Sequence, residues 1–176
     1  LRPENLKQAR VQFEAGQIDA HELKQVEDKA ITELIQKEKE AGLKVITDGE
    51  FRRATWHLDF MWSFEGIGHA PTNTGLPFHD ETAKIDDTFL VGKVERTKEH
   101  PFIEHFRFVQ QFEDETTVAK LTIPAPAQFM EQFIMPMNRE QTDKYYANDQ
   151  ELLEDIVAGY GVFIKQAYAA GCRNLQ

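Results

Sequence analysis

The chain has 176 residues, of which 41% are hydrophobic, so it can bury a core and is not disordered by composition. Its formal net charge of -10 argues against binding to nucleic acid, because phosphate contacts need clustered Lys and Arg. No apolar stretch approaches the roughly 20 residues that span a bilayer, and no signal peptide is visible. The single cysteine, Cys172, excludes an internal disulfide framework and is typical of the reducing cytoplasm.

Two amphipathic helices are predicted at the start of the chain. The first begins near residue 3 and ends at Gly16. Asp19 and Glu22 form a capping-box pattern ahead of a long second helix, and Gly42 ends it. A short buried strand is expected over residues 43–47.

The middle of the chain predicts shorter elements. Residues 54–64 are dense in aromatic side chains and favour a helix. Residues 66–88 carry several glycines and prolines, which indicates a long excursion from the scaffold with hairpin character. A strand over residues 89–94 and a helix over residues 101–112 follow.

The last third continues the alternation of strands and helices. A strand is predicted over residues 118–123, and a short helix over residues 127–135. Asn148 and Glu151 form a second capping pattern, ahead of a long helix that ends at a glycine. Residues 173–176 look like the beginning of another strand.

Strands that alternate with amphipathic helices indicate parallel βα units. No Gly-rich dinucleotide fingerprint or phosphate loop follows any predicted strand, which favours a barrel over a doubly wound nucleotide-binding fold. We therefore expect an α/β fold of the (β/α)8 TIM-barrel type. Such a barrel needs about 250 residues. Residues 1–176 would then form about the N-terminal half of a single barrel domain.

In a barrel, functional groups lie in the loops that follow the strands. Three such loops are predicted: the one from Asp48, the turn after Val94 and residues 122–126. The leading candidate is Glu50, whose carboxylate could bind an ammonium group or act as a general base. The alternative is structural, with Asp48 and Glu50 capping a helix and a neighbouring arginine as ion-pair partner. Spacing alone does not decide between the two.

Other titratable residues favour structural interpretations. His57 is expected to be a hydrogen-bonded structural residue, and Cys172 a small buried one. No group of Cys and His has the spacing of a zinc site, and no catalytic Ser/His/Asp set is recognisable. The sequence therefore assigns no metal ligand and no catalytic residue in this chain.

Four segments together resemble the cobalamin-independent methionine synthase family. They are Leu-Arg-Pro at residues 1–3, Thr-Asp-Gly-Glu-Phe-Arg-Arg at 47–53 with Trp-His at 56–57, Thr-Ile-Pro-Ala-Pro at 122–126, and Ala-Gly-Cys-Arg-Asn-Leu-Gln at 170–176. They occur in the family's order and span the whole chain. The greater similarity is to its short, single-barrel relatives, which correspond to the C-terminal catalytic barrel of the long enzymes.

The resemblance implies zinc-dependent transfer of a methyl group from 5-methyltetrahydropteroyl-polyglutamate, a methyl-tetrahydrofolate, to homocysteine, giving methionine. Glu50 matches the family glutamate that contacts the substrate's amino group, and residues 122–126 match a loop near the folate. Where the long enzymes place a tryptophan shortly after that loop, this chain has residues 128–130, Gln-Phe-Met. Substrate contacts are expected from the residues of these motifs: Glu50, Asp48, Arg53, His57, Thr122 and Pro124.

The family's His, Cys and Glu zinc ligands are expected beyond Gln176, so activity of the isolated segment is not expected. Two alternatives stay open. One is a methyltransferase of the same superfamily that uses a corrinoid or another methyl donor to a thiol; the other is a non-catalytic binding paralogue. We expect a cytoplasmic protein with no nucleic-acid or membrane partner. The sequence does not determine its oligomeric state.

Overall fold

The computed structural model describes residues 2–71, 75–78, 81–84 and 87–176. The chain divides into two compact units, which we describe separately. Unit 1 comprises Leu1–Arg53, His105–Thr122 and Arg173–Gln176. Unit 2 comprises Ala54–Glu104 and Ile123–Cys172.

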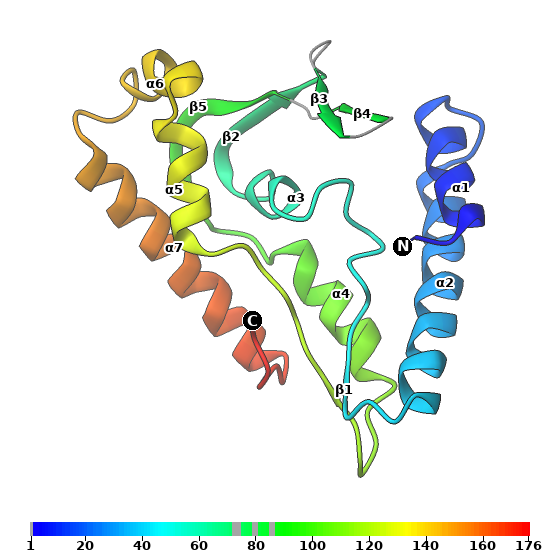
Figure 1. The fold of residues 1–176 in the computed structure, drawn as a ribbon. Coiled ribbons are helices and arrows are strands. Elements are labelled where there is room, and N and C mark those ends of the chain that lie inside the picture. The colour runs from blue at the N-terminus through cyan, green and yellow to red at the C-terminus, as the bar shows by residue number, and fades with distance from the viewer. Residues whose placement is uncertain (1, 72–74, 79–80, 85–86) are drawn as a thin grey trace. The chain divides into compact units, whose positions relative to one another are not determined.

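Two helices, α1 (Glu4–Glu14) and α2 (Ala20–Glu40), lie side by side in unit 1 (Figure 1). The capping box of α2 is formed as predicted: the Glu22 amide donates to Asp19 Oδ1 at 2.8 Å, and the Asp19 amide donates to Glu22 Oε2 at 2.9 Å. The helix ends at Gly42, whose φ of 80° satisfies the left-handed conformation of this C-terminal position.

The sheet of unit 1 is parallel. Strand β1 (Val45–Ile46) pairs with β6 (Val118–Ala119) in parallel, and a further parallel bridge joins Leu121 to Leu175. The incipient strand predicted over residues 173–176 is present as this single parallel bridge, outside any named strand. Parallel pairing between segments that are separated by helices is the α/β pattern. The described residues form no closed barrel.

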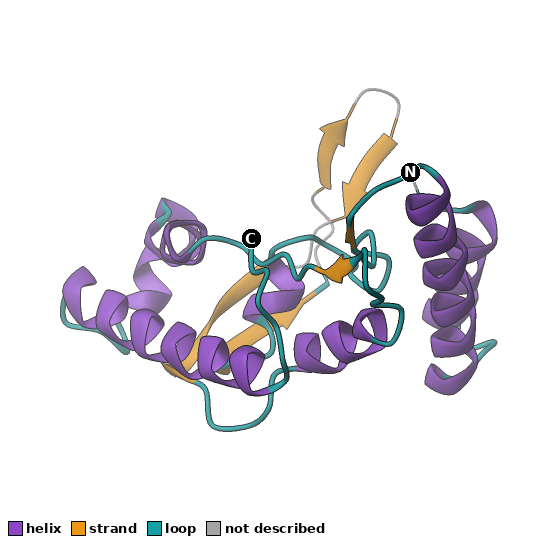
Figure 2. Ribbon diagram, turned by 90° about the horizontal axis from the view of Figure 1, so that it is seen from below, coloured by secondary structure: helices purple, strands orange, loops and turns teal. Residues whose placement is uncertain are grey.

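The strands of unit 2 are antiparallel. Strand β2 (Glu65–Ala70) pairs with β5 (Asp87–Glu95), and β3 (Gly75–Phe78) pairs with β4 (Glu81–Lys84). Figure 2 shows β2 and β5 running side by side. The strand predicted over residues 89–94 exists, but its expected place among the parallel βα units is wrong, because its backbone pairs with β2. Parts of the predicted excursion, residues 72–74, 79–80 and 85–86, lie outside the described residues.

The helices α5 (Pro126–Ile134), α6 (Pro136–Thr142) and α7 (Asp149–Ala169) contact β5 in unit 2. Asn148 caps α7 by accepting the Glu151 amide at 3.0 Å, as predicted. The sequence did not predict α6. No helix among the described residues is long and apolar enough to cross a membrane.

The helix predicted over residues 54–64 is much shorter, because α3 covers only Leu58–Met61. The Asp59 carboxylate accepts the amides of Ala54 and Thr55 at 2.9 and 2.8 Å, which fixes a turn where helix was expected. The helix α4 (Pro101–Gln110) matches its prediction closely.

Aromatic rings fill the core of unit 2. Phe60 is fully buried and its ring contacts several others, including the ring of His100 at a centroid distance of 4.5 Å. His100 accepts the Phe102 amide at Nδ1 and donates from Nε2 to the Phe60 carbonyl, both at 3.1 Å. Both ring nitrogens of His100 are therefore used in hydrogen bonds to the backbone of the buried core.

Candidate functional site

The candidate site is built on a tight turn directly after β1. The Phe51 amide donates to the Asp48 carbonyl at 3.2 Å, and the two residues between them, Gly49 and Glu50, have φ of 60° and 59°. Positive φ at both central positions is typical of a type I′ turn. Glu50 is the only non-glycine residue with positive φ in the described chain, and this conformation costs about 1–2 kcal/mol. The surrounding contacts must therefore impose it.

Asp48 shapes this turn from inside the protein. Its Oδ1 accepts the Glu50 amide at 2.9 Å, while Thr47 Oγ1 accepts the Gly49 amide at 3.2 Å. Asp48 is buried, and its Oδ2 has no hydrogen-bond partner among the described residues. Of the structural alternative, the helix cap is wrong, since the next helix begins only at Leu58, whereas the ion pair with a neighbouring arginine is present between Glu50 and Arg53.

The Glu50 carboxylate is fixed by one oxygen. Its Oε1 accepts from Arg53 Nη1 at 3.1 Å and from Thr122 Oγ1 at 2.8 Å. Arg53 also donates from Nη2 to the Thr122 carbonyl at 2.6 Å and hydroxyl at 3.0 Å. Because the Arg53 side chain is only 1% exposed, its guanidinium orients Glu50 and Thr122 from below the surface.

The other carboxylate oxygen of Glu50 is open. Within residues 2–71, 75–78, 81–84 and 87–176, no group donates a hydrogen bond to Oε2. The Glu50 side chain is 35% exposed. The residue thus combines a fixed orientation with a free acceptor, which is what recognition of a cationic group needs.

Sequence reasoning missed the groups that hold the backbone of this turn. Arg2 donates to the carbonyls of Glu50 and Arg53, and Arg10 donates to the carbonyl of Phe51. A signal was present for Arg10, since it lies within the apolar stripe of the first helix, and a charged residue there needs a buried partner.

His57 and Pro124 belong to unit 2. Burial lowers the pKa of His57, although the Asp59 carboxylate opposes that shift. His57 Nδ1 has no hydrogen-bond partner among the residues the structure describes. The Pro124 carbonyl accepts the Tyr160 hydroxyl at 2.8 Å. The structure thus brings together Asp48, Glu50, Arg53 and Thr122, while substrate contacts by all six predicted residues stay predictions.

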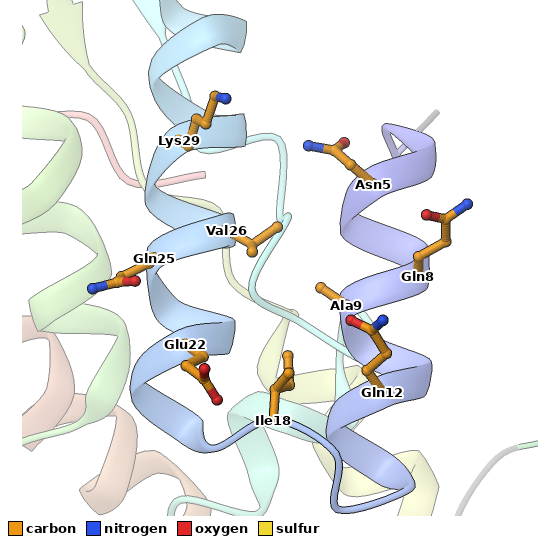
Figure 3. Close-up of a pocket in the computed structure, with 9 residues that line it drawn as sticks. All are labelled: Asn5, Gln8, Ala9, Gln12, Ile18, Glu22, Gln25, Val26 and Lys29. Carbon is orange, nitrogen blue, oxygen red and sulfur yellow. The ribbon is translucent and has the colours of Figure 1, made fainter.

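A separate open groove of about 500 Å³ runs between α1 and α2. Figure 3 shows Val26 of α2 and Ala9 of α1 on its facing walls. Amide side chains line much of the rest: Asn5, Gln8, Gln12 and Gln25. None of the predicted site residues lines this groove.

The described residues contain no candidate metal centre. Among the described residues, no three or more His, Cys, Asp or Glu side chains are grouped so that they could hold a metal ion. The described residues of this chain therefore do not fit a zinc site on their own.

Comparisons with known proteins show which proteins this chain is similar to. No protein-family model matches it. Two uncharacterized Bacillus subtilis (strain 168) proteins, YxjG and YxjH, are 35% and 36% identical to it over 177 aligned residues. The alignments cover 100% of this chain and 45% of each relative, so the chain spans less than half their length.

Two solved structures are similar to this chain. A crystal structure from Listeria monocytogenes, provisionally described as a vitamin-B12-independent methionine synthase, matches with a TM-score of 0.77 and 32% identity. The match covers 100% of this chain and 48% of that one. A B12-independent methionine synthase from Shewanella sp. W3-18-1, in complex with selenomethionine, has a TM-score of 0.64 at 21% identity, over 91% of this chain and 43% of its own, and shares the fold. As its motifs predicted, the chain is similar over its whole length to the Listeria structure, which carries the description of a vitamin-B12-independent methionine synthase.

Proposed function

We propose that the whole protein transfers a methyl group from a methyl-tetrahydrofolate to the thiol of homocysteine, giving methionine. In this reaction a carbon–sulfur bond forms as the carbon–nitrogen bond to the folate breaks. The observation that carries the proposal is the Glu50 carboxylate, with one oxygen held by Arg53 and Thr122 and the other without a donor among the described residues. Its role is to bind the ammonium group that homocysteine and methionine share.

An oriented carboxylate suits this task. A charge-assisted hydrogen bond from an ammonium group to Oε2 would complete the coordination of Glu50, and the buried Arg53 would keep the carboxylate oriented. Asp48 sets the turn that presents Glu50. Contacts of Arg53, His57, Thr122 and Pro124 with the substrates remain part of the proposal.

The rest of the catalytic apparatus is proposed from the resemblance. The parallel segments of unit 1 would be the first strands of a (β/α)8 barrel. Zinc, when bound, would favour the thiolate of homocysteine, the better nucleophile, and we place its ligands outside residues 1–176. The reaction is proposed to take place in the cytoplasm.

Calorimetry on the intact protein tests the amino-acid site. We expect L-methionine to bind the wild type, and Glu50→Gln to weaken that binding by about 1.5–3 kcal/mol, because a neutral amide replaces a charge-assisted acceptor. Glu33→Gln is the matched control, since Glu33 is exposed on α2. Equal affinity of the Glu50→Gln variant and the wild type would remove Glu50 from the site.

The methyl donor needs a separate assay. The intact protein should form methionine from homocysteine with a methyl-tetrahydrofolate polyglutamate. Activity with methylcobalamin alone would instead support the corrinoid-dependent alternative.

A further inference from the structure

The strained turn that carries Glu50 is held from the N-terminal side of unit 1. Arg2 and Arg10 donate to three of its carbonyl groups, those of Glu50, Phe51 and Arg53, with the Arg10 contact at 2.6 Å. Backbone with positive φ at a non-glycine residue persists only where its surroundings over-determine it. These two guanidinium groups are therefore part of what keeps the turn in shape.

The Glu27 carboxylate provides a second connection between Arg10 and the turn, because it also binds Arg52. Glu27 of α2 accepts from Arg10 Nη2 at Oε1, 3.0 Å away, and from Arg52 Nη1 at Oε2, 3.2 Å away. Both oxygens are thus used, and the Glu27 side chain is only 10% exposed. Glu27 connects the arginine that holds the Phe51 carbonyl to the arginine that follows Phe51.

The environment of Arg52 makes this link rigid. The second terminal nitrogen of Arg52, Nη2, forms an ion pair with Asp28, which is next to Glu27 on α2. Its guanidinium also lies over the ring of Phe108, 4.9 Å from the centroid. The Arg52 side chain is 6% exposed. The net stability gained from a buried ion pair is often small, because desolvation offsets the attraction, and in some proteins such groups instead specify a geometry; a positional role is consistent with this arrangement.

We propose that Glu27 is a positioning residue, which sets the conformation of the Asp48–Arg53 turn through Arg10 and Arg52 and so aims the Glu50 carboxylate. This proposal rests on the proposed function only for the ligand of Glu50. Glu27 itself makes no contact with Glu50 in the described structure and is not expected to touch the substrate.

Hydrogen exchange on the intact, ligand-free protein tests the positional role directly. Four amides of the turn, those of Gly49, Glu50, Phe51 and Arg53, are hydrogen-bonded within it. In Glu27→Gln, we expect a peptide spanning residues 48–53 to exchange about threefold faster or more, since exchange follows local opening. Glu33→Gln on the same helix should leave this peptide unchanged. Unchanged exchange in a folded Glu27→Gln protein would overturn the proposal.

A second variant covers the case in which Glu27→Gln does not fold. Glu27→Asp keeps the charge but shortens the side chain by one methylene, so it cannot reach both arginines equally well. We expect the same peptide to exchange faster than in the wild type. Wild-type exchange in that variant would likewise count against a positioning role.

Ligand binding then separates this proposal from the proposed function. We expect Glu27→Gln to weaken L-methionine binding about fivefold, within the range of indirect coupling, and to have no further effect in a Glu50→Gln background. Additive effects in the double variant would show that Glu27 does not act through Glu50. If no variant or wild type binds methionine, the proposed function fails, while the exchange experiment still decides the role of Glu27.

Discussion

Thr122 donates its hydroxyl hydrogen to Glu50 Oε1 across 2.8 Å, although 72 positions separate the two residues in the chain. Glu50 lies in the loop after β1, and Thr122 follows the parallel bridge at Leu121, so the parallel pairing of β1 with β6 brings the two loops to the same edge. The candidate site is therefore made by strand pairing. Substitutions of the residues around Glu50 should therefore differ in their effects on ligand binding and stability, according to the hydrogen bonds each residue makes.

Thr122→Val should weaken L-methionine binding by about 1 kcal/mol, because it removes one of the two donors that fix Glu50 Oε1. The loss should be smaller than that of Glu50→Gln, since Arg53 still holds the carboxylate. Calorimetry on the intact protein measures both. Thr116→Val is the matched control, because the Thr116 hydroxyl also donates to a carboxylate, that of the exposed Asp114. A loss of equal size in the control would show that the effect is not specific to Glu50.

Arg53→Met should lower the free energy of unfolding by about 1–3 kcal/mol, because the Thr122 carbonyl and the Glu50 carboxylate lose their guanidinium donor. Urea denaturation of the intact protein measures this loss. Arg139→Met provides the comparison, since Arg139 pairs with Asp143 and Asp149 at the surface and should cost no more than about 1 kcal/mol. Similar losses in the two variants would contradict the assigned burial of Arg53.

Gly49→Ala should destabilise the protein more than Gly16→Ala. Both glycines have positive φ, 60° and 68°, so each substitution adds about 1–2 kcal/mol of backbone strain. At Gly49 the new methyl group would also lie 2.6 Å from Leu34 Cδ2, whereas at Gly16 it meets nothing within 4 Å. The difference between the two losses of unfolding free energy, measured in urea, isolates the clash with Leu34. Equal losses would mean that Leu34 moves aside at no cost.

The stability contribution of Glu27 should fall as the pH rises. Burial raises the pKa of Glu27 above its ordinary value of 4.5, and this effect outweighs the lowering by Arg10 and Arg52. In the pH window above 4.5, the unfolded chain releases the Glu27 proton while the folded protein still retains it. The unfolding free energy of the wild type minus that of Glu27→Gln should therefore decrease through this window. Urea denaturation at a series of pH values tests the sign, and a difference that grows with pH would contradict it.

Local chemistry determined much of the secondary structure in advance. The pairing of Asp19 with Glu22 and of Asn148 with Glu151 fixed where the two longest helices begin, because these side chains satisfy amides in their own first turns. The helix predicted over residues 54–64 is mostly absent, and the reason is again a side chain that accepts nearby amides. The carboxylate of Asp59 accepts the amides of the first two residues of the expected helix, Ala54 and Thr55, and the observed helix has only four residues.

Strand partnership was not readable from the sequence. Residues 89–94 have the apolar character of a strand, yet that character is the same whether the partner is parallel or antiparallel. The pairing of β5 with β2 decided the matter and removed the loop after Val94 from the set of loops that follow parallel strands.

By itself, the sequence determined the motifs, the starts of the two capped helices and the choice of Glu50 as the leading candidate, since these depend on residue type and short-range spacing. Only the tertiary structure decided that Thr122 and Arg53 share one oxygen of Glu50, and that Glu27 joins two arginines around the turn. Hydrogen bonds between residues far apart in the chain depend on how the strands and helices pack, and no local pattern in the sequence encodes those distances.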